Sequence, residues 1–181
     1  MENIYRFPLK MHVGAPDIPV VKINQEVKRG QCIAEPNGLG AKIHTSVSGK
    51  VKIITRTEIE ICAYENQSSD FLKIKECKDI CESVYEAGVV GAGGAGFPTH
   101  IKLKTQIPKG YIIANCIECE PALHHNIEMI EGKPELVIKG IRYAMKATGA
   151  KKAYVAIKAK NVKAIDSLEK CISDETDIKL S

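Results

Sequence analysis

Hydrophobic and polar residues alternate over short stretches in the first third of the chain. Residues 19–35 and 41–54 are each made of short runs rich in valine and isoleucine, and each run pair is separated by a turn, at residues 28–30 and 48–49. This alternation predicts an all-β module. The stretch that follows, residues 65–70, is polar and turn-rich and predicts a linker, so we place the first domain at residues 1–69.

The pattern changes beyond residue 70 to a helical period that alternates with apolar runs. It predicts helices over residues 76–87, 136–147 and 162–172, a buried strand over 111–117, a second strand over 153–157 and the start of a third at 177–181. Strands that alternate with helices at these loop lengths indicate a parallel α/β sheet in residues 70–181. Because the chain stops on a starting strand, we expect this domain to be incomplete.

A glycine-rich segment lies between the first helix and the first strand of this domain. Residues 88–102 read GVVGAGGAGFPTHIK, with five glycines in nine positions before an expected helix start. Glycine lets backbone N–H groups approach a ligand closely, and a helix N-terminus adds unpaired donors, so the segment predicts a phosphate cradle. It lacks the Gly-Lys-Ser/Thr of a P-loop, and a glycine-rich turn without a ligand is the alternative.

A second polar group follows the predicted strand over 111–117. Residues 115–121 read NCIECEP and place Asn115, Glu118 and Glu120 at the carboxyl end of that strand. Ligands of open parallel sheets bind beyond the carboxyl ends of the strands, so these side chains are candidates for ligand contact. The alternative is that they are solvated carboxylates before a helix N-terminus.

Composition narrows the function classes. The net charge of +4 is mild and the lysines are scattered, so a nucleic-acid surface is not indicated. No apolar run reaches the length of a membrane span and no signal peptide is evident, so we expect a cytoplasmic protein with reduced thiols among its seven cysteines. The pairs Cys77/Cys81 and Cys116/Cys119 could form a metal site, but half-buried apolar positions explain them better. Neighbouring His124 and His125 are interpreted as capping or surface residues, and we expect no metal.

GAGGAGFPTHIK followed by NCIECEP resembles the RnfC-type subunit of NADH–ferredoxin electron-transport complexes and the RnfC-like electron-transfer proteins linked to proline reductase. It is more distantly similar to the flavin subunit of respiratory complex I. The stretches HVGAP at residues 12–16 and HTSVSGKV at residues 44–51 resemble the N-terminal region of the same family. The resemblance implies a barrel-sandwich hybrid domain over 1–69 and the first part of a parallel α/β domain for flavin and nucleotide over 70–181.

The resemblance also implies which residues would bind FMN. Gly91 and Gly93 would approach the phosphate and ribityl chain, Lys102 would neutralise the phosphate or lie against the isoalloxazine, and Asn115 and Glu118 would hydrogen-bond the flavin.

A further set of residues would contact the nicotinamide nucleotide. Gly94, Ala95 and Phe97 would lie against NADH, and Glu120 would reach its ribose or amide. Hydride would pass from NADH to the flavin, and single electrons would leave to iron–sulfur clusters or to a partner reductase. We therefore expect an electron-transfer subunit whose partners are other subunits of a redox complex, peripheral to a membrane at most.

The chain departs from the family pattern in two respects. Ala92 and Ile117 replace an arginine and an aspartate of complex I subunits, which favours the RnfC branch. Family members also continue well beyond this length, with a further flavin-site segment, a small ubiquitin-like domain and the 4Fe-4S cluster motifs. Either the chain is a fragment or reading stopped early, for example at a selenocysteine codon taken as a stop. We expect the 181-residue chain to be inactive by itself.

Two other functions are weighed against this one. The chain could be a non-catalytic module that docks other redox subunits. It could also be a lipoyl or biotinyl carrier, but the position where a carrier lysine belongs holds Gly38, and Lys42 lies too close to the second turn. The β module is therefore interpreted as structural.

Overall fold

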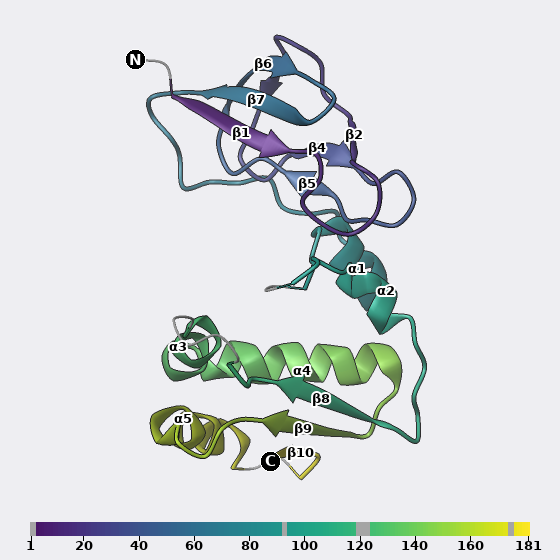
Figure 1. Cartoon of the computed structure of the whole chain (residues 1–181), viewed down its shortest axis with the longest axis vertical. Coiled ribbons are helices and arrows are strands. Elements are labelled where there is room, and N and C mark those ends of the chain that lie inside the picture. Colours follow the sequence, from purple (N-terminus) through teal and green to yellow (C-terminus); the bar gives the residue numbers. More distant parts are fainter. Residues whose placement is uncertain (1–2, 92–93, 119–123, 174–175) are drawn as a thin grey trace. The chain divides into compact units, whose positions relative to one another are not determined.

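The computed structural model describes residues 3–91, 94–118, 124–173 and 176–181. It divides into two compact units, Met1–Lys102 and Leu103–Ser181 (Figure 1). The first unit contains the β module, two short helices and the glycine segment. The predicted linker at residues 65–70 therefore lies inside the first unit.

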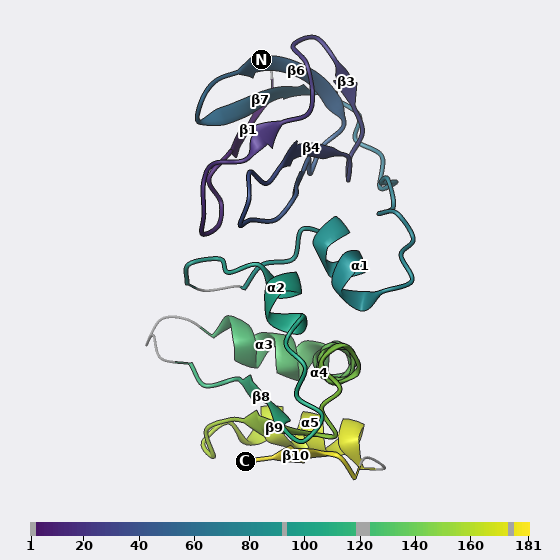
Figure 2. The same ribbon diagram turned by 90° about the vertical axis from the view of Figure 1, so that its right-hand side faces the viewer.

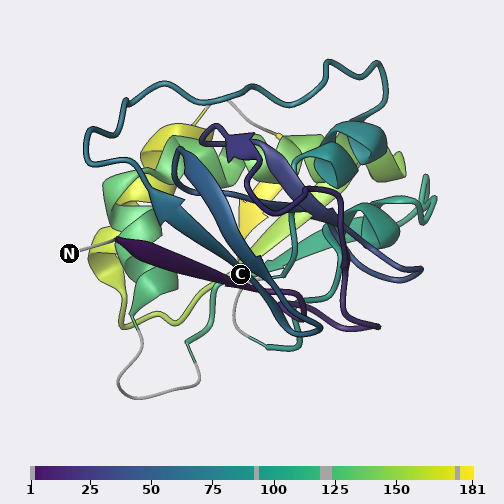
Figure 3. The same ribbon diagram turned by 90° about the horizontal axis from the view of Figure 1, so that it is seen from above.

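The β module is built from two antiparallel sheets, whose strands are the purple and blue arrows of Figures 2 and 3. One sheet has the order β1–β7–β6–β3, formed by Ile4–Pro8, Glu58–Ala63, Gly49–Ile54 and Glu26–Val27. The other has the order β2–β4–β5, formed by Ile18–Pro19, Cys32–Glu35 and Ile43–His44. The expected all-β module is confirmed at this level.

One apolar core is shared by both sheets. Ile33 of β4 and Val51, Ile59 and Ile61 of β6 and β7 are fully buried, and they belong to a single cluster. Along β7 the buried residues alternate with less buried ones, which is the period that a strand with one core-facing side requires. Burial of these aliphatic side chains, at about 25 cal/mol per Å² of apolar surface, is the main stabilising contribution to the module.

Helix α1 (Ile80–Glu86) begins later than the predicted residue 76. The side chain of Asp79 accepts a hydrogen bond from the backbone N–H of Glu82 at 2.9 Å, so the helix starts at this N-cap. Gly88 follows the C-terminal end with φ of 66°, as the sequence predicted for a helix stop. Residues before Asp79 are extended because the apolar period alone does not supply a cap.

The second unit has a three-stranded parallel sheet in the order β10–β9–β8. Its strands are β8 (Tyr111–Asn115), β9 (Lys152–Ala156) and β10 (Ile178–Leu180), and its helices are α3 (His125–Gly132), α4 (Pro134–Thr148) and α5 (Val162–Ile172). The predicted parallel α/β arrangement is confirmed. Pro134 in the first turn and Gly149 at φ of 73° bound α4 as expected.

The helices of this unit pack on one face of the sheet. The chain passes from β8 through α4 to β9 and from β9 through α5 to β10, and right-handed crossovers in one direction place both helices on the same side (Figure 1). Their buried residues Ile138, Ile141 and Leu168 pack with Ala153 and Val155 of the central strand.

The opposite face of the sheet is open, and this corrects one prediction. Strand β8 was expected to be buried, but Tyr111 and Ile113 are 56% and 61% exposed. They point away from the helices, and Tyr111 makes an edge-to-face contact with Tyr154 at 5.3 Å between ring centroids. An apolar run alone does not reveal whether one or both faces of its strand are covered. Within the described residues, no helix combines the length and hydrophobicity needed to cross a bilayer.

Candidate functional site

The glycine segment is closed by a small antiparallel contact. Val90 and Pro98 form a bridge, the N–H of Gly91 donates to the carbonyl of Phe97 at 2.9 Å, and the N–H of Thr99 donates to the carbonyl of Val89 at 3.0 Å. These bonds hold the two ends of the segment together. The residues between them form a short projecting loop, of which Gly94 to Gly96 are described by the structure.

Gly94 is the position in this loop where glycine is needed for a ligand to approach. Its φ of 140° is unfavourable for any residue with a side chain, and no atom lies within 4 Å of the place where a Cβ would stand. Ala95 beside it is exposed. A backbone held in an open, glycine-only conformation matches the close approach of a ligand that the sequence predicted.

Gly91 and Lys102 lie near one another in the first unit. A Cβ on Gly91 would stand 3.9 Å from the Lys102 Nζ and 3.7 Å from the Phe97 carbonyl oxygen, both ordinary contacts. The Lys102 ammonium also lies 5.6 Å from the centre of the Phe97 ring. The structure therefore brings together the predicted residues Gly91, Phe97 and Lys102, with one cation beside the glycine segment.

The helix start that was expected to supply donors is short. Helix α2 (Thr99–Leu103) has five residues, and its Thr99 and Ile101 N–H groups already donate to the carbonyls of Val89 and Pro98. The charge of Lys102 and the glycine backbone, rather than a helix N-terminus, are therefore what this segment offers to an anion.

The segment is joined to the β module by an ion pair that sequence reasoning missed. Lys42 Nζ lies 2.9 Å from both carboxylate oxygens of Glu86 on α1 and 3.3 Å from Glu35 on β4. Its side chain is only 12% exposed, and the two carboxylates outweigh the effect of burial and raise the pKa of Lys42. Two carboxylates hold this amine inside the unit, which is not the geometry of a carrier lysine.

In the second unit, Asn115 stands at the carboxyl end of β8. Its Oδ1 accepts a hydrogen bond from the Ile117 N–H at 3.1 Å, and the residue is exposed. Its amide nitrogen thus remains directed by a local turn at the sheet edge where a ligand was expected.

Glu118 has a defined structural role at the same edge. Its Oε1 accepts a hydrogen bond from the Asn126 N–H in the first turn of α3 at 2.8 Å, and its carbonyl accepts from the Lys158 Nζ at 2.6 Å. A carboxylate at a helix N-terminus satisfies a free donor and interacts favourably with the helix dipole. Lys158 was missed by the sequence reasoning, although its place two residues after β9 was a usable signal.

The predicted residues are thus divided between the units. Gly91, Gly94, Ala95, Phe97 and Lys102 belong to the first, and Asn115 and Glu118 to the second. Their convergence on one ligand stays a prediction. The remaining predicted positions, Gly93 and Glu120, lie outside the described residues.

The cysteines and histidines take ordinary positions. Cys116 is buried in the core of the second unit, where burial and then the charge of Glu118 raise the pKa of its thiol. His124 is the N-cap residue of α3 and His125 follows it with a half-exposed ring. No cluster of three or more potential metal-binding side chains occurs in the parts of the chain that the structure describes.

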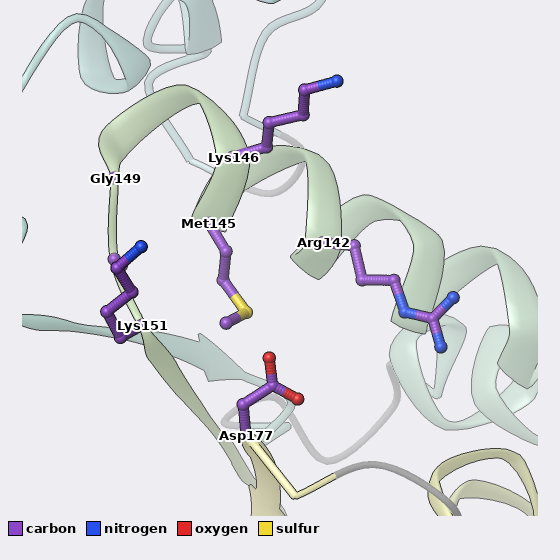
Figure 4. A pocket seen from close by; sticks show the side chains of 7 residues that line it. Arg142, Met145, Lys146, Gly149, Lys151 and Asp177 are labelled. Atoms are coloured by element: carbon purple, nitrogen blue, oxygen red, sulfur yellow. The ribbon is translucent and has the colours of Figure 1, made fainter.

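A hollow of about 470 Å³ lies at the opposite, amino edge of the parallel sheet (Figure 4). It is formed where α4 ends and β9 begins, and the Asp177 carboxylate points into it below Met145. The C-terminal end of a helix and a carboxylate both disfavour anions. It is lined by Arg142, Met145, Lys146, Gly149, Ala150, Lys151 and Asp177. This hollow is therefore a poor candidate for a nucleotide phosphate.

Comparison with known families bears directly on the glycine segment and the sheet edge. Residues 84–181 match the Nuo51 FMN-binding domain, and residues 1–68 match the RnfC barrel sandwich hybrid domain. The chain belongs to the Nuo51 FMN-binding domain family, with an RnfC-type domain before it. The Nuo51 match includes every predicted site residue, on both compact units.

Individual relatives have the same two-part organisation. The RnfC-type subunit of the Na(+)-translocating ferredoxin:NAD(+) oxidoreductase complex of Acetobacterium woodii is 31% identical over 192 residues, which cover 96% of this chain and 43% of the relative. The counterpart from the proton-translocating complex of Clostridium ljungdahlii is 34% identical, covering 90% of this chain and 40% of the relative. Cobalamin reductase PduS of Salmonella typhimurium is 43% identical over 96 residues, 53% of this chain and 21% of the relative.

These relatives confirm the RnfC-type resemblance of this flavin-domain chain. The chain spans about two fifths of the length of the Acetobacterium and Clostridium proteins. All three relatives carry names of oxidoreductases or of their subunits, so electron transport is the process common to them.

Proposed function

We propose that the protein is the FMN- and NADH-handling part of an electron-transfer subunit, which passes electrons from NADH through FMN to iron–sulfur clusters or a partner reductase. The observation that carries this proposal is the open, glycine-only backbone at Gly94 inside a segment that matches the FMN-binding domain. FMN is a phosphate ester with a flat ring, so it needs both a close backbone approach and a cation.

The first unit offers both of these features. A Cβ at Gly94 would project into free space at a φ that side chains avoid, which leaves room beside the backbone. Lys102 is exposed and stands next to Gly91, so its ammonium is placed to neutralise the FMN phosphate. Gly93 is assigned the same role as Gly91, toward the phosphate and ribityl chain.

The second unit supplies polar groups for the flavin ring in this proposal. Asn115 would donate from its amide nitrogen, because its Oδ1 already accepts from Ile117. Glu118 is partly committed to α3 through Asn126, so its second carboxylate oxygen is the one proposed to face the flavin. The residues proposed for the nicotinamide nucleotide are Gly94, Ala95, Phe97 and Glu120.

When bound, FMN supplies the chemistry that converts two-electron transfer from NADH into single-electron steps. The protein's own contribution is to bind and orient: Lys102 neutralises charge, Phe97 offers a ring face, and the glycine backbone donates N–H groups. The 4Fe-4S clusters would belong to other parts of the complex. Its partners are other subunits of a redox complex, and a place at the periphery of a membrane complex fits the names of the relatives.

Titration of FMN against the purified chain tests this proposal. Bound FMN is expected to lose fluorescence and to show a perturbed absorbance spectrum, and a longer version that includes the length of the relatives is expected to bind more tightly. Riboflavin, which lacks the phosphate, is the matched control ligand and is expected to bind more weakly than FMN. Absence of FMN binding by both versions would rule out the flavin role.

A non-catalytic docking module is the second candidate. The observation that favours it is the commitment of Glu118 to α3 and Lys158, which uses groups otherwise free for a ligand. In that case neither version of the chain would perturb the FMN spectrum, and both would still bind a redox subunit.

A further inference from the structure

The strongest unexplained feature of the first unit is a buried pair of ionisable side chains, His12 and Asp17. Their side chains are 2% and 0% exposed, and His12 Nε2 lies 3.1 Å from Asp17 Oδ1. Burial of a carboxylate is costly unless a partner compensates its charge. In the described part of the chain, no hydrogen bond other than this contact with His12 reaches the Asp17 carboxylate.

Both ring nitrogens of His12 face oxygen atoms. Nδ1 lies 2.8 Å from the Val13 carbonyl oxygen, and Nε2 lies 3.1 Å from the Ala41 carbonyl oxygen as well as near Asp17. An imidazolium donates from both nitrogens, whereas neutral imidazole has one donor and one acceptor. The surroundings therefore suit the protonated ring. Burial lowers the pKa of His12, but the Val13 carbonyl and Asp17 outweigh it, and the net pKa is raised.

His12 is also in close contact with the glycine segment. Gly96 is buried at φ of 64°, and a Cβ there would stand 3.0 Å from the His12 Cα and 3.1 Å from the Met11 carbonyl oxygen. On the other side, a Cβ on Gly40 would stand 2.6 Å from the His12 Cε1. Both glycines are needed because His12 fills the space between them.

We propose that His12 and Asp17 are positioning residues: the protonated pair holds the glycine segment at Gly96 and so sets the conformation of the flavin-binding loop. Loss of the proton leaves the Asp17 carboxylate uncompensated in the interior, and the chain around His12 must rearrange. Gly96 lies directly against His12 and moves with it, together with the adjoining Phe97. As regards flavin affinity, this inference rests on the proposed function.

The pH dependence has a definite sign. Because the folded-state pKa of His12 is above its ordinary value of about 6.5, the contact is complete below that pH and is lost as pH rises through the folded value. Among the described groups that contact the ring, from the segments of Val13, Ala41, Gly40 and Gly96, Asp17 is the other titratable one.

Nuclear magnetic resonance of the 15N-labelled chain without flavin tests this inference between about pH 5.5 and 9. The Gly96 and Phe97 amide signals are expected to shift with one midpoint, shared with the His12 ring and above about 6.5. Asp17→Asn should lower that midpoint by roughly one unit or more, because it removes the neighbouring charge. His12→Gln should remove the step.

Ile61→Val is the matched control, because it trims the core of the β module without touching Gly96. It should lower stability and leave the midpoint unchanged. The wild-type titration needs no variant, so it decides the matter even where a substitution prevents folding. A Gly96 amide signal that stays constant with pH, or that keeps its step in His12→Gln, would overturn the inference.

Flavin titration at pH 6 and pH 8.5 then separates this inference from the proposed function. Loss of one buried hydrogen-bonded contact predicts about tenfold weaker FMN binding at the higher pH. Equal FMN affinity at both pH values would overturn the link between the pair and the loop. A pH step at Gly96 with no FMN binding at either pH would refute the flavin role and leave the positioning role standing.

Discussion

The Lys42 ammonium lies 2.9 Å from both carboxylate oxygens of Glu86, although the two residues are 44 positions apart in the chain. This contact ties the β module to the helix from which the glycine segment emerges. A second close approach lies beside it: a Cβ on Gly88 would stand 2.2 Å from the Lys42 carbonyl oxygen. The β module thus acts as a support for the start of the glycine segment, and not only as a neighbouring domain.

Replacement of Lys42 by methionine should destabilise the first unit. Charge-assisted hydrogen bonds are worth about 1.5–3 kcal/mol each in partly buried settings, so we expect a loss on the order of 2 kcal/mol in the free energy of unfolding. Lys50→Met on β6 is the control, because that side chain is exposed. Chemical denaturation measures both, and equal losses would show that the Glu86 contact contributes little.

The same buried amine should carry no lipoyl or biotinyl group. Mass spectrometry of protein from its native host is expected to show the unmodified mass at Lys42. An acyl increment on that residue would mean that the amine leaves Glu86 and Glu35 and that the β module is a carrier.

The two glycines at the loop should respond differently to substitution. Gly94→Val requires φ of 140°, at a cost of about 1–3 kcal/mol, and fills the open space beside the backbone, so FMN binding should be lost. Gly91→Ala places a methyl group at ordinary contact distances and should retain most of the affinity. Fluorescence titration of both variants tests this. Equal effects of the two would mean that the conformation of Gly94 is not what the ligand requires.

Lys102→Ala should weaken FMN binding without abolishing it. One charge-assisted contact to a phosphate is worth about 1.5–3 kcal/mol, which corresponds to roughly a ten- to hundredfold loss of affinity. Riboflavin affinity should be unchanged by the same substitution, because riboflavin has no phosphate. A parallel loss for both ligands would point to a packing role of Lys102 against Phe97 instead.

Acid should destabilise the first unit through His44. Burial, followed by the charge of Lys42, lowers the pKa of His44 below its ordinary value of about 6.5. The unfolded chain therefore binds a proton before the folded one does, and the free energy of unfolding falls as pH drops below that value. His44→Gln should remove this part of the acid sensitivity, measured by denaturation at about pH 7.5 and 5.5. An undiminished loss in the variant would assign it to other groups.

The sequence alone determined the elements whose signals are local. Residues 162–172 form α5 as predicted, α4 is bounded by Pro134 and Gly149, and the strands over 111–115 and 152–156 are parallel. Amphipathic period, turn residues and crossover handedness act within a few residues or one supersecondary unit. They are therefore readable without knowledge of the rest of the chain.

The tertiary structure decided what depends on contacts between distant segments. The covered face of β8, the contact of Glu118 with Lys158, and the placement of His12 against both Gly40 and Gly96 are of this kind. His12 precedes Gly96 by 84 positions, and no local pattern couples them. Whether a histidine is a surface residue or a buried cation depends on which backbone packs against it, and only the folded chain brings that backbone there.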